Sequence, residues 1–168
     1  MKIPLDVGKK WAGRIRREIL PFCERVDVAG SIRRGRPIVH DIDLVAIPRD
    51  MTRLKERCLR KAVPLSNGNQ NFRFELSIGL QVEIYFAWPK QGELFAETPS
   101  NFGSLWLCRT GSREHNIHLV EHAKTLGLRW RPYVGVFDAE NKLIASETER
   151  DIFSALGLDF IPPERRER

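Results

Sequence analysis

The stretch "VAGSIRRGRPIVHDIDLVAIP", residues 28 to 48, decides the fold, because it leads one strand into another through a basic, glycine-punctuated loop. Residues 39 to 47 form an apolar run typical of a buried strand, interrupted by Asp41 and Asp43. Side chains two positions apart on a strand point to the same face, so the two carboxylates project together. Unpaired buried carboxylates repel each other and lose hydration, so cations must compensate their charge.

Two sources of positive charge could compensate the aspartates. The first is an ion pair on a solvated strand end, in which Arg33, Arg34 or Arg36 folds back onto the aspartates. The second is bound metal beside a phosphate site. The Gly30-Ser31 turn exposes backbone amides that can cradle phosphate oxygens, and Arg34 can add charge-assisted hydrogen bonds.

Two later stretches favour metal and phosphate. Glu83, in "LQVEIYFA", lies on an apolar strand with no obvious local cation, and a third carboxylate would complete an oxygen-rich site for two Mg²⁺ ions. Residues 110 to 116, "TGSREHN", form a second Gly-Ser turn that opens a helix. The amides and dipole of such a helix start suit an anion or a nucleotide edge.

The composition fits a globular protein with a polyanionic partner. The chain has 168 residues, 42% of them hydrophobic, which is enough to bury a core. Its formal charge is +6, from 28 Lys and Arg against 22 Asp and Glu, although a mildly basic surface also serves solubility. The three cysteines form no C-x-x-C pair, so we expect no disulfide framework and a cytoplasmic location. No stretch approaches the ~20 apolar residues of a membrane span, so we expect no membrane association.

Periodicity and turn signals predict an α+β fold. A capping box, "SETE" at residues 146 to 149, is expected to start the last helix, and Ser112 is expected to cap an earlier one. The predicted helices cover residues 7–22, 52–62, 98–111, 112–127 and a last segment that follows the 146–149 capping box and runs through Ile152, Phe153 and Leu156. The predicted strands cover 26–29, 39–47, 72–76, 80–87 and a hairpin that turns at 138–141.

These motifs, in this order, resemble the family X DNA polymerases of the polymerase beta nucleotidyltransferase superfamily. The resemblance rests on Gly30-Ser31, Arg33-Arg34-Gly35, Asp41-Ile42-Asp43, the later acid and "TGSREHN". It extends through "AKTLGLRW" and the ending "SETERDIFSALGLDFIPPERRE", which resemble the family's thumb. It implies a nucleotidyltransferase palm, a mixed sheet with flanking helices, over residues 1–108 and a small α/β thumb over 109–168. It leaves no room for the amino-terminal lyase and helix-hairpin-helix segments, or the exonuclease appendage, of longer members.

The resemblance also implies roles for single residues. Asp41 and Asp43 would hold both metals, and Glu83 would bind the catalytic metal and help to deprotonate the primer 3′-hydroxyl. The residues implied to contact the nucleotide are Gly30, Ser31, Arg34 and His40 at the triphosphate, Gly111 and Ser112 beneath the sugar, and Asn116 at the minor-groove edge of the base. Arg113 would contact DNA. The implied cofactor is two Mg²⁺ ions, for which Mn²⁺ can substitute, and the implied partners are gapped or primer-template DNA and a dNTP or NTP, bound by a monomer.

Three positions depart from the family pattern. The third acid is usually aspartate, so the longer Glu83 can shift the metal geometry or lower activity. Cys108 and Arg109 replace the aromatic pair that commonly precedes "TGS", which relaxes the expected gate against ribonucleotides. His40 stands where glycine is common and can add a contact to the triphosphate.

Other functions compete with this one. The string "HLVEH", residues 118 to 122, has the H-x-x-E-H spacing of a zinc-peptidase helix, with His115 one turn earlier. A nucleotidyltransferase acting on a non-DNA acceptor and a catalytically weakened DNA-binding module are the remaining alternatives.

Overall fold

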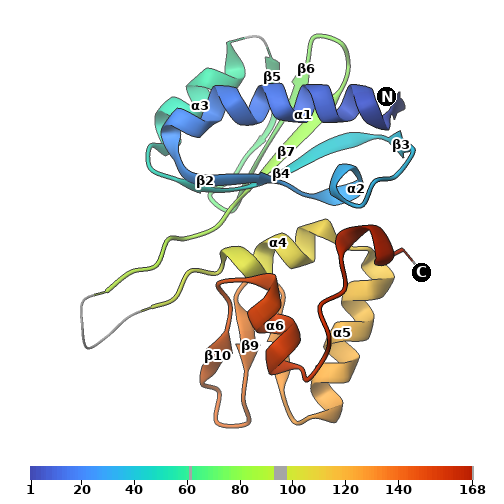
Figure 1. Cartoon of the computed structure of the whole chain (residues 1–168). Coiled ribbons are helices and arrows are strands. Elements are labelled where there is room, and N and C mark those ends of the chain that lie inside the picture. Colours follow the sequence, from blue (N-terminus) through green and yellow to red (C-terminus); the bar gives the residue numbers. More distant parts are fainter. Residues whose placement is uncertain (61, 93–97, 168) are drawn as a thin grey trace. The chain divides into compact units, whose positions relative to one another are not determined.

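The computed structural model describes residues 1–60, 62–92 and 98–167. These residues divide into two compact units, Met1–Ala87 and Trp88–Arg168 (Figure 1). The predicted functional boundary between residues 108 and 109 falls inside the helix Phe102–Thr110, all of which belongs to the second compact unit. The α+β class is confirmed.

The first unit is built on a mixed sheet of five strands within the described residues. Its order is β2-β4-β7-β6-β5, and among these described strands only the β4–β7 pair is parallel. The strands are β2 (Cys23–Val28), β4 (Asp41–Pro48), β5 (Ala62–Asn67), β6 (Asn71–Leu76) and β7 (Gln81–Phe86), with a separate small pair β1 (Ile3–Pro4) and β3 (Ile38–Val39). The helical segments are α1 (Leu5–Ile19), η1 (Leu20–Phe22), α2 (Gly30–Arg33) and α3 (Met51–Leu59).

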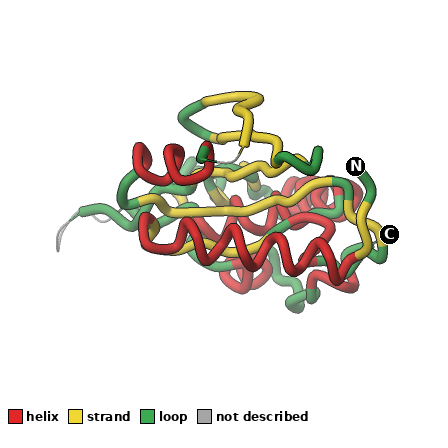
Figure 2. Tube along the Cα trace, turned by 90° about the horizontal axis from the view of Figure 1, so that it is seen from above, coloured by secondary structure: helices red, strands yellow, loops and turns green. Residues whose placement is uncertain are grey.

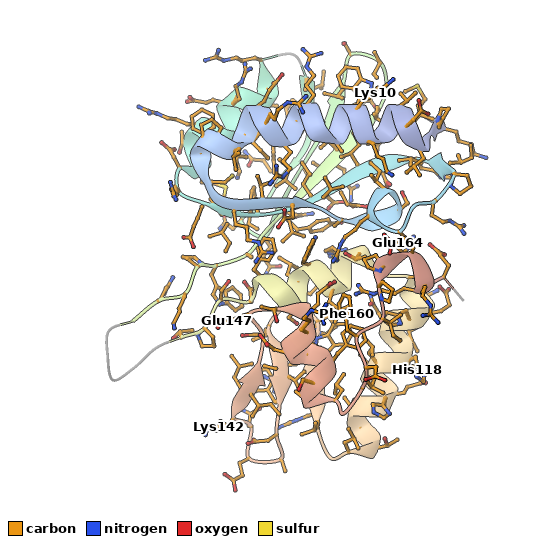
Figure 3. The ribbon with its side chains drawn as sticks, in the orientation of Figure 1. Lys10, His118, Lys142, Glu147, Phe160 and Glu164 are labelled. Carbon is orange, nitrogen blue, oxygen red and sulfur yellow. The ribbon has the colours of Figure 1, made fainter. Side chains whose placement is uncertain are left out.

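Helix α1 covers one face of this sheet. Its Ala12, Ile15 and Ile19 are buried, and the helix contacts β2 and β4 (Figure 2). Lys10 lies on its exposed side (Figure 3). The burial of one apolar stripe and the exposure of the basic stripe explain why the helical periodicity of the sequence was a sound guide.

The second unit packs helices against a small antiparallel sheet of order β10-β9-β8 in its described part. Its core contains Leu107, Leu119, Trp130, Ile152 and Phe153. The elements are α4 (Phe102–Thr110), α5 (Arg113–Thr125), β8 (Arg129–Arg131), β9 (Gly135–Phe137), β10 (Leu143–Ala145), α6 (Glu149–Ala155) and η2 (Pro163–Arg165). No helix in the described ranges is long and apolar enough to cross a membrane.

Several predicted boundaries were wrong. The strand β5 was missed because its residues are mostly exposed and therefore lack an apolar alternation. Helix α4 begins at Phe102 and not after Thr98, and the Gly30-Ser31 turn already belongs to the short helix α2. The capping box of α6 joins Thr148 to Asp151, not residues 146 and 149.

Candidate active site

Three carboxylates share one face of the first unit's sheet. In the parallel β4–β7 pair, Asp43 lies opposite Glu83 and Asp41 lies opposite Gln81. Aligned residues of neighbouring strands project to the same face, and so do residues two apart on one strand. Asp41, Asp43 and Glu83 are exposed or half-buried, whereas the intervening Ile42 is buried on the other face. The register therefore brings the predicted third acid beside the predicted pair.

The Gly-Ser turn lies directly against this acidic face. Gly30 has a φ of +60°, and a Cβ built on it would lie 2.0 Å from Oδ2 of Asp43. The Ala29 amide donates a hydrogen bond of 2.9 Å to the Asp43 carbonyl. Only glycine leaves room here, so the absent side chain lets the turn and the carboxylate come into contact.

The other predicted phosphate contacts lie along the same loop. The Ser31 hydroxyl is buried and has no hydrogen-bond partner among the described residues. Arg34 is half-buried at the end of α2, and His40 is exposed between β3 and β4. The predicted phosphate residues thus lie along the connection from β2 to β4, the same connection that brings Gly30 against Asp43.

Glu83 has a local cation that the sequence reading missed. Arg73 lies opposite Glu83 in the antiparallel β6–β7 pair, and its Nη2 is 3.1 Å from Oε2 of Glu83. Asn71 Nδ2 donates a hydrogen bond to the other oxygen, Oε1. The expectation of no local cation was wrong because ten residues of sequence separate a pair that the strand register makes adjacent.

The donor chemistry fits a hard divalent cation. Three carboxylates supply only oxygen ligands, which is the set that Mg²⁺ prefers. No group of three or more His, Cys, Asp or Glu side chains in the described ranges is close enough to hold a metal ion. In this arrangement both oxygens of Glu83 accept hydrogen bonds, from Asn71 and from Arg73.

In the second unit, the predicted sugar-binding turn is stabilised by hydrogen bonds to other residues of the same unit. Gly111 ends α4 with a φ of 69° and is joined to Ser112 by a cis peptide bond. The Ser112 hydroxyl donates a hydrogen bond of 2.7 Å to the Arg166 carbonyl and accepts one of 3.2 Å from the His115 amide. The predicted cap of α5 is confirmed, and the hydroxyl of Ser112 is a structural group in this turn.

Asn116 links this turn to the predicted sugar gate. Its Nδ2 donates a hydrogen bond of 2.7 Å to the Cys108 carbonyl, and its buried Oδ1 has no partner in the part of the chain described.

Burial raises the pKa of the half-buried Cys108 thiol. The Arg109 guanidinium lies 4.8 Å from the centre of the Tyr133 ring. Arg113 is exposed at the first position of α5.

The three histidines of α5 lie in different environments. His115 is buried and stacked on Phe153, with 5.9 Å between ring centres. His118 is exposed on α5 (Figure 3) and stacks on His122, whose Nε2 is 2.9 Å from the Leu156 carbonyl. The imidazole of His122 therefore contacts the backbone at the end of α6. Among the described residues, the H-x-x-E-H segment does not form a cluster of three or more possible metal ligands.

Comparison with solved structures defines the fold. Two structures of Leishmania infantum polymerase beta, a ternary primer–template complex and a ternary gap complex, each match with a TM-score of 0.79, at 17% and 16% identity. Each match covers 100% of this chain, and 77% and 71% of the polymerase beta chains. The fold is therefore that of polymerase beta.

Sequence comparisons narrow the class. Residues 105–167 match the family model of the DNA polymerase beta thumb. The chain is 29% identical to the DNA polymerase/3′-5′ exonuclease PolX of Bacillus subtilis over 99% of its length, and 25% identical to the human DNA-directed DNA/RNA polymerase mu over 84%. It spans 29% and 36% of the lengths of these two curated relatives. These matches make the chain similar to family X DNA polymerases, with the thumb model covering its second unit from residue 105 onward.

Proposed function

We propose that this chain adds a nucleotide from a nucleoside triphosphate to a primer 3′-hydroxyl, in filling short gaps during DNA repair. The observation that carries this proposal is the register of Asp43 with Glu83, next to the Gly30 turn. It puts acids and backbone amides on one sheet face, which is the combination that transfer of a nucleotidyl group requires.

Each residue of the first unit has a role in this proposal. Asp41 and Asp43 would hold the divalent ions, and Glu83 would accept the proton of the primer hydroxyl at a carboxylate oxygen. When bound, two Mg²⁺ or Mn²⁺ ions stabilise charge on the attacking and leaving oxygens. Gly30, Ser31, Arg34 and His40 would bind and orient the triphosphate.

We assign the sugar and base contacts to the second unit. Gly111 and Ser112 would shape the surface beneath the sugar, Asn116 would contact the base, and Arg113 would contact DNA. Cys108 and Arg109 would replace an aromatic gate. The human relative is named as a DNA/RNA polymerase, which supports including ribonucleotides among the substrates to be tested.

The proposed partners and setting follow from charge and thiol chemistry. The net charge of +6 favours DNA as the polyanion. We further propose that the protein binds it as a monomer. Cys23, Cys58 and Cys108 are free thiols, which fits a reducing compartment such as the cytoplasm.

Extension of a labelled primer on gapped and on single-stranded DNA tests the proposal. Wild-type protein with Mg²⁺ should extend the primer, and Asp43→Asn, which keeps the shape of the side chain but removes its charge, should abolish extension while the protein stays folded. Unchanged turnover by Asp43→Asn would end the polymerase proposal. DNA affinity should fall linearly on a plot of log K against log[salt].

One observation favours a second candidate, a catalytically weakened DNA-binding module. The third acid is a glutamate held by Arg73 and Asn71. If this contact persisted on metal addition, DNA would still bind with the same salt dependence but no primer would be extended. The extension assay separates the two functions.

A further inference from the structure

The side chains of Arg73 and Glu83 differ in solvent exposure, and this difference matters for metal binding. The Glu83 side chain is only 14% exposed, whereas that of Arg73 is 44% exposed. Glu83 lies between two strands, with Asp43 opposite it on one side and Arg73 opposite it on the other. The carboxylate can therefore face either toward Asp43 or toward the arginine.

Glutamate makes this choice possible. Its extra methylene, relative to aspartate, lengthens the reach of the carboxylate across the sheet. Both oxygens now accept hydrogen bonds, one from Arg73 and one from Asn71. A divalent cation that uses Glu83 as a ligand must displace at least part of this arrangement and must approach a guanidinium of like charge.

We infer that Arg73 is a positioning residue that competes with the divalent cation for the Glu83 carboxylate. Arg73 holds the third acid away from Asp41 and Asp43 until a dication draws it back. The inference rests on the proposed function, because it concerns the metal ligands of that same site. Arg73 lies on β6, outside the strands that carry the three acids, so a residue of β6 would control the affinity of the site for the metal.

A double-mutant cycle on metal binding tests this inference without any nucleotide transfer. Four full-length proteins are compared: wild type, Arg73→Gln, Glu83→Gln and the double variant. The dissociation constant of Mn²⁺ is measured from the free-ion signal in electron paramagnetic resonance, without DNA or nucleotide. Arg73→Gln should lower this constant about five- to tenfold, and the same substitution in the Glu83→Gln background should change it less than about twofold.

Arg53→Gln is the matched control. Arg53 is also an arginine of the first unit paired with a carboxylate, Asp50, at 3.5 Å, and its loss removes the same charge. It should leave the Mn²⁺ constant unchanged. Circular dichroism of each variant establishes that it is folded before binding is compared.

Three outcomes would overturn the inference. An equal effect of Arg73→Gln in both backgrounds would mean that the arginine acts through its general charge. Weaker or unchanged Mn²⁺ binding by Arg73→Gln would mean that Arg73 does not compete with the cation. A lack of saturable binding in all four proteins would mean that these residues form no Mn²⁺ site. Primer extension, measured separately, reports on the proposed function: extension without coupling rejects only the inference, and coupling without extension rejects only the polymerase.

Discussion

The guanidinium of Arg166 and the carboxylate of Glu149 form a buried ion pair with two contacts, Nη1–Oε1 at 2.8 Å and Nη2–Oε2 at 3.3 Å. Their side chains are 0% and 4% exposed. The same guanidinium lies near Phe153 and Phe160, and Figure 3 shows Phe160 among the side chains of this unit. Because the Arg166 carbonyl accepts the hydrogen bond of Ser112, the pair anchors the segment that supports the "TGS" turn.

Removing one partner of this pair should destabilise the second unit strongly. Arg166→Met leaves Glu149 buried without its cation, and Glu149→Gln leaves the guanidinium without its anion, so each should cost about 3–5 kcal/mol. Urea unfolding of the full chain measures the loss. Lys10→Met is the control, since its contact with Asp6 is at 4.0 Å and fully on the surface, and its unfolding midpoint should not move. Equal midpoints for Arg166→Met and Lys10→Met would contradict the structural role.

Gly30→Ala should separate backbone strain from loss of the site. The new Cβ would collide with the Asp43 carboxylate, and the φ of +60° adds about 1 kcal/mol of strain. Gly79→Ala is the matched control, because Gly79 has a φ of +77° and nothing within 4 Å of an added Cβ. Both variants should lose stability, but only Gly30→Ala should lose Mn²⁺ binding and primer extension. Full activity of a folded Gly30→Ala protein would show that the turn tolerates a displaced Asp43.

Ribonucleotide use should depend on Cys108 and Arg109. Neither offers a rigid aromatic wall beside a sugar, and the Arg109 head lies over Tyr133. We expect the ratio of kcat/KM for dNTP to that for rNTP to rise about tenfold when both residues become Tyr and Phe, which corresponds to ~1.4 kcal/mol. Deoxynucleotide turnover should persist. Strong rejection of rNTP by the unmodified protein would show that the backbone forms the gate.

Stability should fall in alkali through Cys58, a half-buried thiol of the first unit. Burial raises the pKa of Cys58 from 9.0 to about 12, so folding disfavours its thiolate. This contribution is complete below the pKa of the unfolded thiol and is lost as pH rises toward that of the folded one. Cys58→Ala should therefore lose less stability than wild type between about pH 8 and about pH 10 in urea unfolding. Parallel pH curves for the two proteins would refute the buried-thiol explanation.

The sequence by itself determined the class of fold and the core of the candidate site. The apolar stripe of α1, the two aspartates at alternate positions and the "TGS" turn are local patterns, each fixed by a helical or strand period or by a cap. Ser112 at the start of α5 shows how reliable such a signal is, since the predicted cap makes the expected hydrogen bond. These features need only neighbouring residues to form.

Tertiary structure decided which residues meet across strands and across long stretches of chain. The sequence reading missed Arg73 because its contact with Glu83 depends on the β6–β7 register, which periodicity alone does not set. It misassigned Glu149 to a cap because a charged residue at a helix start is normally exposed, whereas here the distant Arg166 compensates its burial. Charge compensation in a folded interior is a property of position in space, so the partners of these two acids could be known only once the chain was folded.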